Sequence, residues 1–276
     1  MPASTVRNGT RRIRSTGRPP SVLLLPAVLG LAFLTLPLLA LIVRVPWRAL
    51  PAQLLSADVG TALRLSLVSA SLATLICLLL GVPLAWVLAR TTFPGRRLLR
   101  AVVTVPLVLP PVVGGVALLL LLGRRGLVGQ YLDAWFGISL PFSTAAVVLA
   151  EAFVAMPFLV IAVEGALRSA DPRYEEAAAT LGASRFHSFR RVTLPLVAPG
   201  VTAGGVLCFA RALGEFGATI TFAGSFPGVT RTMPLAVYLA LETNRDAALV
   251  LSLLLLMVSV LVLASLRERW ITGRAG

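Results

Sequence analysis

The sequence contains no lysine, one histidine and two cysteines among 276 residues. Without lysine it cannot form the Gly-x-x-x-x-Gly-Lys-Ser/Thr loop that binds nucleotide phosphates, which excludes an ATPase of that class. His187 stands alone, and Cys77 and Cys208 have no spacing typical of a metal site or a disulfide framework. We therefore predict no catalytic residue, no metal and no cofactor bound by this chain.

Charge is also scarce, because only 13% of the residues are charged while 57% are hydrophobic and the mean hydropathy is +0.91. A soluble protein cannot bury that much apolar surface, and a helix of about 20 apolar residues spans a bilayer. We expect an all-α integral membrane protein with six transmembrane helices. Their predicted ranges are 21–43, 59–89, 99–122, 143–165, 197–222 and 247–266.

All 25 basic residues are arginine, and the net charge of +14 is unevenly placed. Seventeen arginines lie in residues 7–18, 90–100, 168–191 and 267–274. This bias follows the positive-inside rule and places both termini and the loop 168–199 in the cytoplasm, with no need for a nucleic-acid partner. We expect residues 1–20 to be a disordered basic arm and 21–270 to be the membrane domain.

Two of the predicted spans contain residues that a simple lipid-facing helix would not carry. The span 99–122 has Pro106, Pro110-Pro111 and Gly114-Gly115, which indicate either a packing kink or irregular backbone lining a cavity. Glu151 lies inside the span 143–165, where a carboxyl group is costly unless it faces protein or water.

The loop 168–199 is predicted to fold into two short helices. Asp171 and Pro172 are typical of a helix N-terminus, and Gly182 accepts the left-handed conformation that ends a helix. Ser184 can cap a second helix, which we expect Pro195 to end. The result would be a compact knob at the membrane surface.

The same loop resembles the EAA loop of ABC-importer membrane subunits. The matching residues are Glu176-Ala177-Ala178, then Gly182 after three residues, then Val192-Thr193-Leu194-Pro195 after nine more. In that family the loop is a coupling helix that docks in a groove on the ATPase subunit. The resemblance assigns this role to Glu175, Glu176, Ala177, Ala178, Gly182, Leu194 and Pro195. The alternative is an amphipathic surface loop that binds nothing.

The span 197–222 carries a second resemblance. Arg211 and Glu215 are four residues apart and can pair on one helix face, while Gly214 and Gly217 allow close backbone approach and Thr219 offers a hydroxyl donor. The run Ala210 to Gly224 and the following Gly228 to Pro234 resemble molybdate-type permeases, with sulfate, thiosulfate or tungstate as alternative substrates. The pair is either structural or in contact with the oxyanion.

These resemblances imply a type I ABC-importer permease in the bacterial plasma membrane. The implied partners are two copies of an ATPase subunit carrying ATP and magnesium, an extracytoplasmic oxyanion-binding protein, and a second copy of this chain in a homodimer. A secondary transporter is the alternative, but no internal repeat supports it. An intramembrane enzyme lacks an obvious acid–base or metal constellation.

Overall fold

The computed structural model describes residues 21–54 and 56–272, and every regular element among them is a helix. The predicted basic arm, residues 1–20, lies outside this part of the chain. Helix α1 (Ser21–Arg44) forms a unit of its own, and the other helices belong to a second unit. That unit contains α2 (Leu50–Leu54), α3 (Ala57–Arg90), α4 (Arg96–Val108), α5 (Pro111–Leu122), α6 (Gly129–Phe136), α7 (Thr144–Ser169), α8 (Arg173–Thr180), α9 (Arg185–Ser188), a π-helix (Phe189–Thr193), α10 (Leu194–Leu213), α11 (Gly217–Phe222), α12 (Met233–Thr243) and α13 (Arg245–Thr272).

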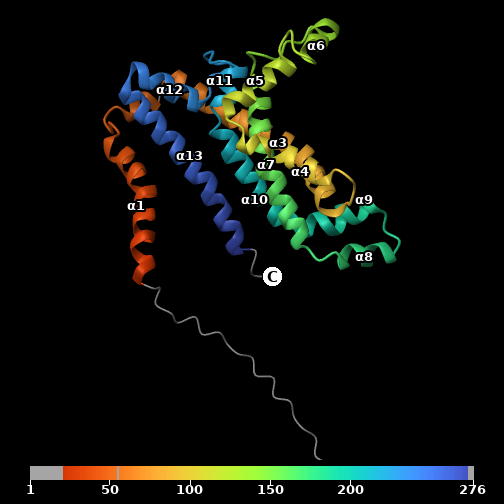
Figure 1. The fold of residues 1–276 in the computed structure, drawn as a ribbon. Helices are drawn as coiled ribbons and strands as arrows, with labels where there is room; N and C mark the ends of the chain where they lie inside the picture. Colours follow the sequence, from red (N-terminus) through yellow and green to blue (C-terminus); the bar gives the residue numbers. More distant parts are fainter. Residues whose placement is uncertain (1–20, 55, 273–276) are drawn as a thin grey trace, which may run out of the picture. The chain divides into compact units, whose positions relative to one another are not determined.

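Helices α3, α7 and α10 form the core of the second unit and lie side by side (Figure 1). Small side chains line the contact, and Ala70, Ala73 and Cys77 of α3 are fully buried against it. A Cβ atom at Gly81 would lie 3.1 Å from Leu159 of α7, so these helices already touch closely. Small residues let these membrane helices pack closely, through van der Waals contact at short range.

Five helices in the described residues are long and apolar enough to cross a membrane, and a sixth span results if α4 and α5 are counted together. The predicted span 99–122 is in fact two helices bent by 116°. The preceding helix ends at Val108, because the ring of Pro110 cannot continue it, and Pro111 then occupies the first position of α5. The six predicted runs are thus present, but this one is not a continuous helix.

Two expectations about the fifth span are wrong. Pro195 does not end the second short helix, because helical backbone continues from Arg185 to Leu213. The π-helix before Pro195 widens the turn, and the Leu194 N–H reaches back to the Phe189 carbonyl. The chain thereby accommodates the proline without a break.

The second wrong expectation concerns the other end of this span, which was predicted to be one helix up to residue 222. The helix α10 instead stops at Leu213, and α11 begins at Gly217. The following segment contains a further helix, α12. These elements depend on the packing described below, which no local pattern specified.

Candidate coupling surface and intramembrane ion pair

Helices α8 and α9, residues 173–188, form a knob at one end of α7 and α10 (Figure 1). The helix α8 begins at Arg173, so its N-cap is Pro172 and the prediction of Asp171 as the cap is wrong by one residue. The Asp171 carboxylate still accepts a hydrogen bond of 3.0 Å from the Arg173 N–H. Gly182 has φ +81°, and the Ser184 hydroxyl accepts from the His187 N–H. The predicted caps at Gly182 and Ser184 are therefore confirmed.

The outer surface of this α8–α9 knob is unusually apolar. Leu181 is 88% exposed, Phe186 is 72% exposed, and Tyr174 is also exposed. Glu176 and Ala177 lie on the exposed side of α8, whereas Glu175 and Ala178 are half-buried. The residues that the resemblance assigns to the coupling loop therefore lie on two faces of the knob. One face is exposed, and the other packs against the rest of the protein.

The inward face is tied to the end of α3. Arg90 forms an ion pair of 3.1 Å with Glu175, and its guanidinium also donates to the Ala170 carbonyl at 3.3 Å. Trp86 meets Phe189 edge to face, with ring centroids 6.1 Å apart. A displacement of the knob must therefore move α3 as well as α7 and α10. Sequence reasoning missed these contacts, because Arg90 and Glu175 are far apart in the chain.

Leu194 and Pro195, also assigned to the coupling loop, lie beyond the knob in the first turn of α10. Leu194 is half-buried against the α3–α7–α10 core, and Pro195 is exposed. They connect the knob to a long helix and are not part of its outward surface.

A second ionic cluster lies nearby, between α4 and α7. Glu164 accepts from Arg100 at 2.5 Å and from Arg168 at 2.8 Å through the same carboxylate oxygen. The Arg96 Nε–H donates to the Leu88 carbonyl at 2.8 Å, at the end of α3. These bonds fasten the start of α4 to the neighbouring helices.

Arg211 and Glu215 pair as predicted, at 2.6 Å, but they do not share one helix. The helix α10 ends between them, at Leu213. The other oxygen of Glu215 accepts a bond of 2.9 Å from the Ala218 N–H in the first turn of α11. Glu215 is 1% exposed and Arg211 26% exposed as side chains, so the carboxylate is enclosed while the guanidinium keeps an open edge. The pair holds the break between α10 and α11.

The two glycines predicted to allow close approach behave differently. A Cβ atom at Gly217 would lie 2.9 Å from Pro111 and 3.1 Å from the Val112 nitrogen, so this glycine is required by packing of α11 on α5. At Gly214 the nearest atom would be the Ala210 carbonyl oxygen at 3.6 Å, an ordinary contact. The expectation for Gly214 is therefore wrong, because the backbone there has already left the helix.

The hydroxyl groups of this segment have separate roles. Thr219 is fully buried, and its hydroxyl has no hydrogen-bond partner among the described residues. Thr221 donates to the Gly217 carbonyl at 2.8 Å. Thr219, which was predicted as a hydrogen-bond donor, lies in α11 four residues after the enclosed Glu215. Its hydroxyl makes no hydrogen bond among the described residues.

Glu151 is 1% exposed and faces protein, as a carboxyl group at that depth requires. One of its oxygens accepts a bond of 2.8 Å from the Ser69 hydroxyl of α3, whereas the other has no partner among the residues described. The sequence indicated the acid but gave no sign of its partner.

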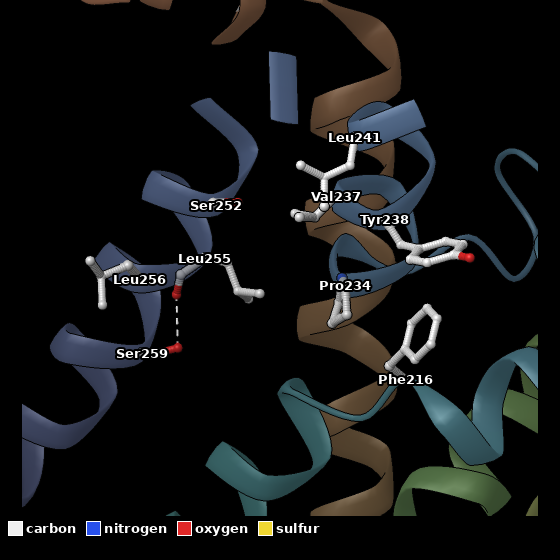
Figure 2. Close-up of a pocket in the computed structure, with 9 residues that line it drawn as sticks. All are labelled: Phe216, Pro234, Val237, Tyr238, Leu241, Ser252, Leu255, Leu256 and Ser259. Carbon is white, nitrogen blue, oxygen red and sulfur yellow. Dashed lines mark hydrogen bonds between the residues drawn. The ribbon is translucent and has the colours of Figure 1, made fainter. Parts of the chain in front are cut away.

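A recess of about 430 Å³ opens beside Phe216, between α12 and α13 (Figure 2). Figure 2 shows Pro234, Val237, Tyr238 and Leu241 of α12 facing Ser252, Leu255, Leu256 and Ser259 of α13. The rings of Phe216 and Tyr238 lie 5.2 Å apart. None of these lining residues is charged, so the recess has no group that could compensate a dianion.

Comparisons with known proteins show similarity to transport permeases. The chain is 55% identical over 245 residues to the molybdenum transport system permease protein ModB of Mycobacterium tuberculosis, covering 89% of this chain and 92% of that protein. It is 38% identical over 237 residues to the sulfate transport system permease protein CysT of Salmonella typhimurium, covering 84% and 85%.

Among solved structures, a bacterial ABC transporter involved in alginate import has the same fold, with a TM-score of 0.72 at 18% identity over 90% of this chain and 93% of that one. The expected type I ABC-importer fold is thereby confirmed. Residues 78–273 match the family described as the binding-protein-dependent transport system inner membrane component. The chain belongs to this family of multi-pass membrane permeases.

Proposed function

We propose that this chain forms the transmembrane pathway of an ATP-driven importer for molybdate in a bacterial plasma membrane. The observation that carries the mechanism is the α8–α9 knob, whose outward face is exposed and whose inward face is tied to α3 by Arg90 and Glu175. The greater similarity to a molybdenum permease than to a sulfate permease supports molybdate. Tungstate is the nearest alternative, because it has the same shape and charge.

The partner of the knob is a separate ATPase subunit that binds ATP and magnesium. Exposed Leu181 and Phe186 offer apolar anchors, and the surrounding arginines offer charge for a polar rim. When two ATPase subunits close, the knob moves as a unit and pulls on α3. Glu175, Glu176, Ala177, Ala178 and Gly182 then serve as the coupling surface.

The permease is proposed to act as a homodimer. Each chain has one coupling loop, and two ATPase subunits need two loops related by a two-fold axis. The uncharged recess beside Phe216 is a surface that a second copy would cover. An extracytoplasmic oxyanion-binding protein delivers the substrate, since the described residues offer no enclosed cationic cage in the membrane.

Within the pathway, the Arg211–Glu215 pair acts first as a structural clamp. Glu215 is enclosed and bonds to both Arg211 and the α11 backbone, so its charge is satisfied internally. The exposed edge of Arg211 adds weak attraction for a passing dianion. Weak attraction suits a conduit, because a strong cationic site would retain the ion.

Both termini and the loops 90–100 and 168–199 are proposed to be cytoplasmic. The Arg90–Glu175 pair supports placing the two loops on one side. Single cysteines introduced in 90–100 and 168–199 should react with a membrane-impermeant thiol reagent only in inside-out vesicles. Cysteines in 123–142 should react only in right-side-out cells. Reaction of 168–199 from outside would contradict the coupling role.

Transport itself is tested by uptake of radiolabelled molybdate into proteoliposomes containing the chain with its ATPase and binding protein. Uptake should require ATP and compete with unlabelled tungstate but not with sulfate. Competition by sulfate alone would assign the sulfate function instead. ATP-independent uptake driven by an ion gradient would support the secondary-transporter alternative.

A further inference from the structure

A recess of about 510 Å³ lies where α4 begins, apart from the knob and from the Arg211–Glu215 clamp. It is lined by Thr92, Phe93, Gly95, Arg96, Arg97, Arg100 and Arg168. Four guanidinium groups from α4 and α7 therefore converge on one opening. Nothing in the coupling role described above uses them.

The charges in this recess are not balanced. Glu164 is the carboxylate paired with Arg100 and Arg168, and it satisfies both through one oxygen. Arg97 is exposed and has no acidic partner among the described residues. The neighbouring Arg90 is matched by Glu175. Four cations facing one anion leave a local excess of positive charge.

Three of the four arginines are held in place rather than free to turn away, and Arg97 is the exception. Arg96 is fixed by its bond to the Leu88 carbonyl, and Arg100 and Arg168 are fixed by Glu164. Fixed guanidinium groups lose little side-chain freedom when they bind an anion. Their planar donors match the oxygens of a tetrahedral oxyanion, which can accept two parallel hydrogen bonds from each.

The surroundings indicate where such an anion would come from. Phe93 lines the recess and is itself exposed. An exposed aromatic side chain inside a cationic opening suits a phospholipid, whose phosphate meets the arginines while its acyl chains cover the apolar ring. A dissolved oxyanion would use only the arginines.

We propose that the Arg96–Arg97–Arg100–Arg168 recess binds a tetrahedral oxyanion, supplied by the headgroup phosphate of an anionic membrane phospholipid. Binding would bridge α4 and α7 through Arg97 and Arg168. Because Arg90 links the end of α3 to the knob, an anion in this recess lies next to the elements that move during coupling.

The test uses the full chain in its assembled transporter and measures lipid binding by native mass spectrometry. Phosphatidylglycerol is titrated against phosphatidylcholine. Arg97→Gln should weaken phosphatidylglycerol binding about fivefold, the contribution of one arginine near a membrane surface. Arg97→Gln with Arg168→Gln should weaken it about 25-fold if the two act independently. Glu164 keeps Arg100 as its partner in that variant, so folding should persist.

Arg125→Gln is the matched control, since Arg125 is exposed in the segment between α5 and α6 and has no acidic partner in the part of the chain described. It should leave lipid binding unchanged. Displacement of lipid by millimolar molybdate or phosphate, lost in Arg97→Gln, would keep the site but assign it to a dissolved oxyanion. Equal binding of both lipids, or equal weakening by Arg125→Gln, would overturn the proposal.

Discussion

Two arginine–glutamate pairs in this permease have similar geometry but different surroundings. Arg211 and Glu215 approach to 2.6 Å with Glu215 enclosed, whereas Arg90 and Glu175 approach to 3.1 Å with both side chains partly exposed. An enclosed charge that loses its partner cannot be rescued by water, but an exposed one can. We therefore expect the first pair to maintain the fold, and we propose that the second transmits movement of the knob.

Two glycines, one in the membrane and one in the knob, also differ in the reason for which they are required. Gly217 is required because its neighbours leave no space for a side chain, while Gly182 is favoured because its φ of +81° disfavours most side chains. Packing specifies the intramembrane glycine, and backbone conformation specifies the one in the knob. Four experiments test the contrasts between these ion pairs and between these glycines, and they follow in decreasing order of expected effect.

Arg211→Ala should be the most damaging change, because it leaves the Glu215 carboxylate enclosed and unpaired. Breaking a buried pair typically costs about 3–5 kcal/mol. Thermal unfolding in detergent and size-exclusion chromatography should show lost stability and assembly. The double change with Glu215→Ala should recover most of this, apart from about 1 kcal/mol for the lost bond from Ala218. Equal damage in single and double variants would contradict the clamp.

Gly217→Val should destabilise the packing of α11 on α5 by about 1–3 kcal/mol, because its side chain meets Pro111 and Val112. The matched control is Gly214→Ala, three residues away, where the added Cβ has an ordinary contact distance. The control should retain normal thermal stability. If both variants lose the same stability, glycine is required in this segment for backbone conformation and not for close packing against α5.

Gly182→Val should affect coupling more than folding. The left-handed backbone costs a β-branched residue about 1–2 kcal/mol, and this strain is confined to the turn between α8 and α9. In proteoliposomes with the partner ATPase, molybdate uptake should fall while ATP hydrolysis persists. Gly182→Asn should retain coupling, because asparagine accepts this conformation. Normal uptake by the valine variant would argue against a rigid knob.

Arg90→Ala and Glu175→Ala should each lower the free energy of unfolding by about 1–2 kcal/mol, less than Arg211→Ala, because Glu175 keeps 25% of its side chain exposed whereas Glu215 keeps 1%. Both should still lower the number of ions imported per ATP hydrolysed. The charge-reversed double variant, Arg90→Glu with Glu175→Arg, should restore part of that ratio. If it restores nothing, the link between α3 and the knob depends on the contact of Trp86 with Phe189 instead.

Much of the architecture could be predicted from the sequence, because membrane spans and helix caps depend on residues that are close together in the chain. About 20 apolar residues specify a span, and Gly182 and Ser184 specify their caps through their own backbone and side chain. The structure confirms these elements. The family followed from the loop and from the Arg211–Glu215 segment, and residues 78–273 match it.

Tertiary structure alone decided how the helices end and which distant residues meet. The break after Leu213 is stabilised by the bonds of Glu215 and by the close approach of α5 to Gly217. The local sequence was equally consistent with one continuous helix. Glu151, Glu164 and Glu175 each meet a partner from another helix, namely Ser69, Arg100 and Arg90. Sequence spacing predicts contacts within one helix, whereas contacts between helices depend on how their faces pack in three dimensions.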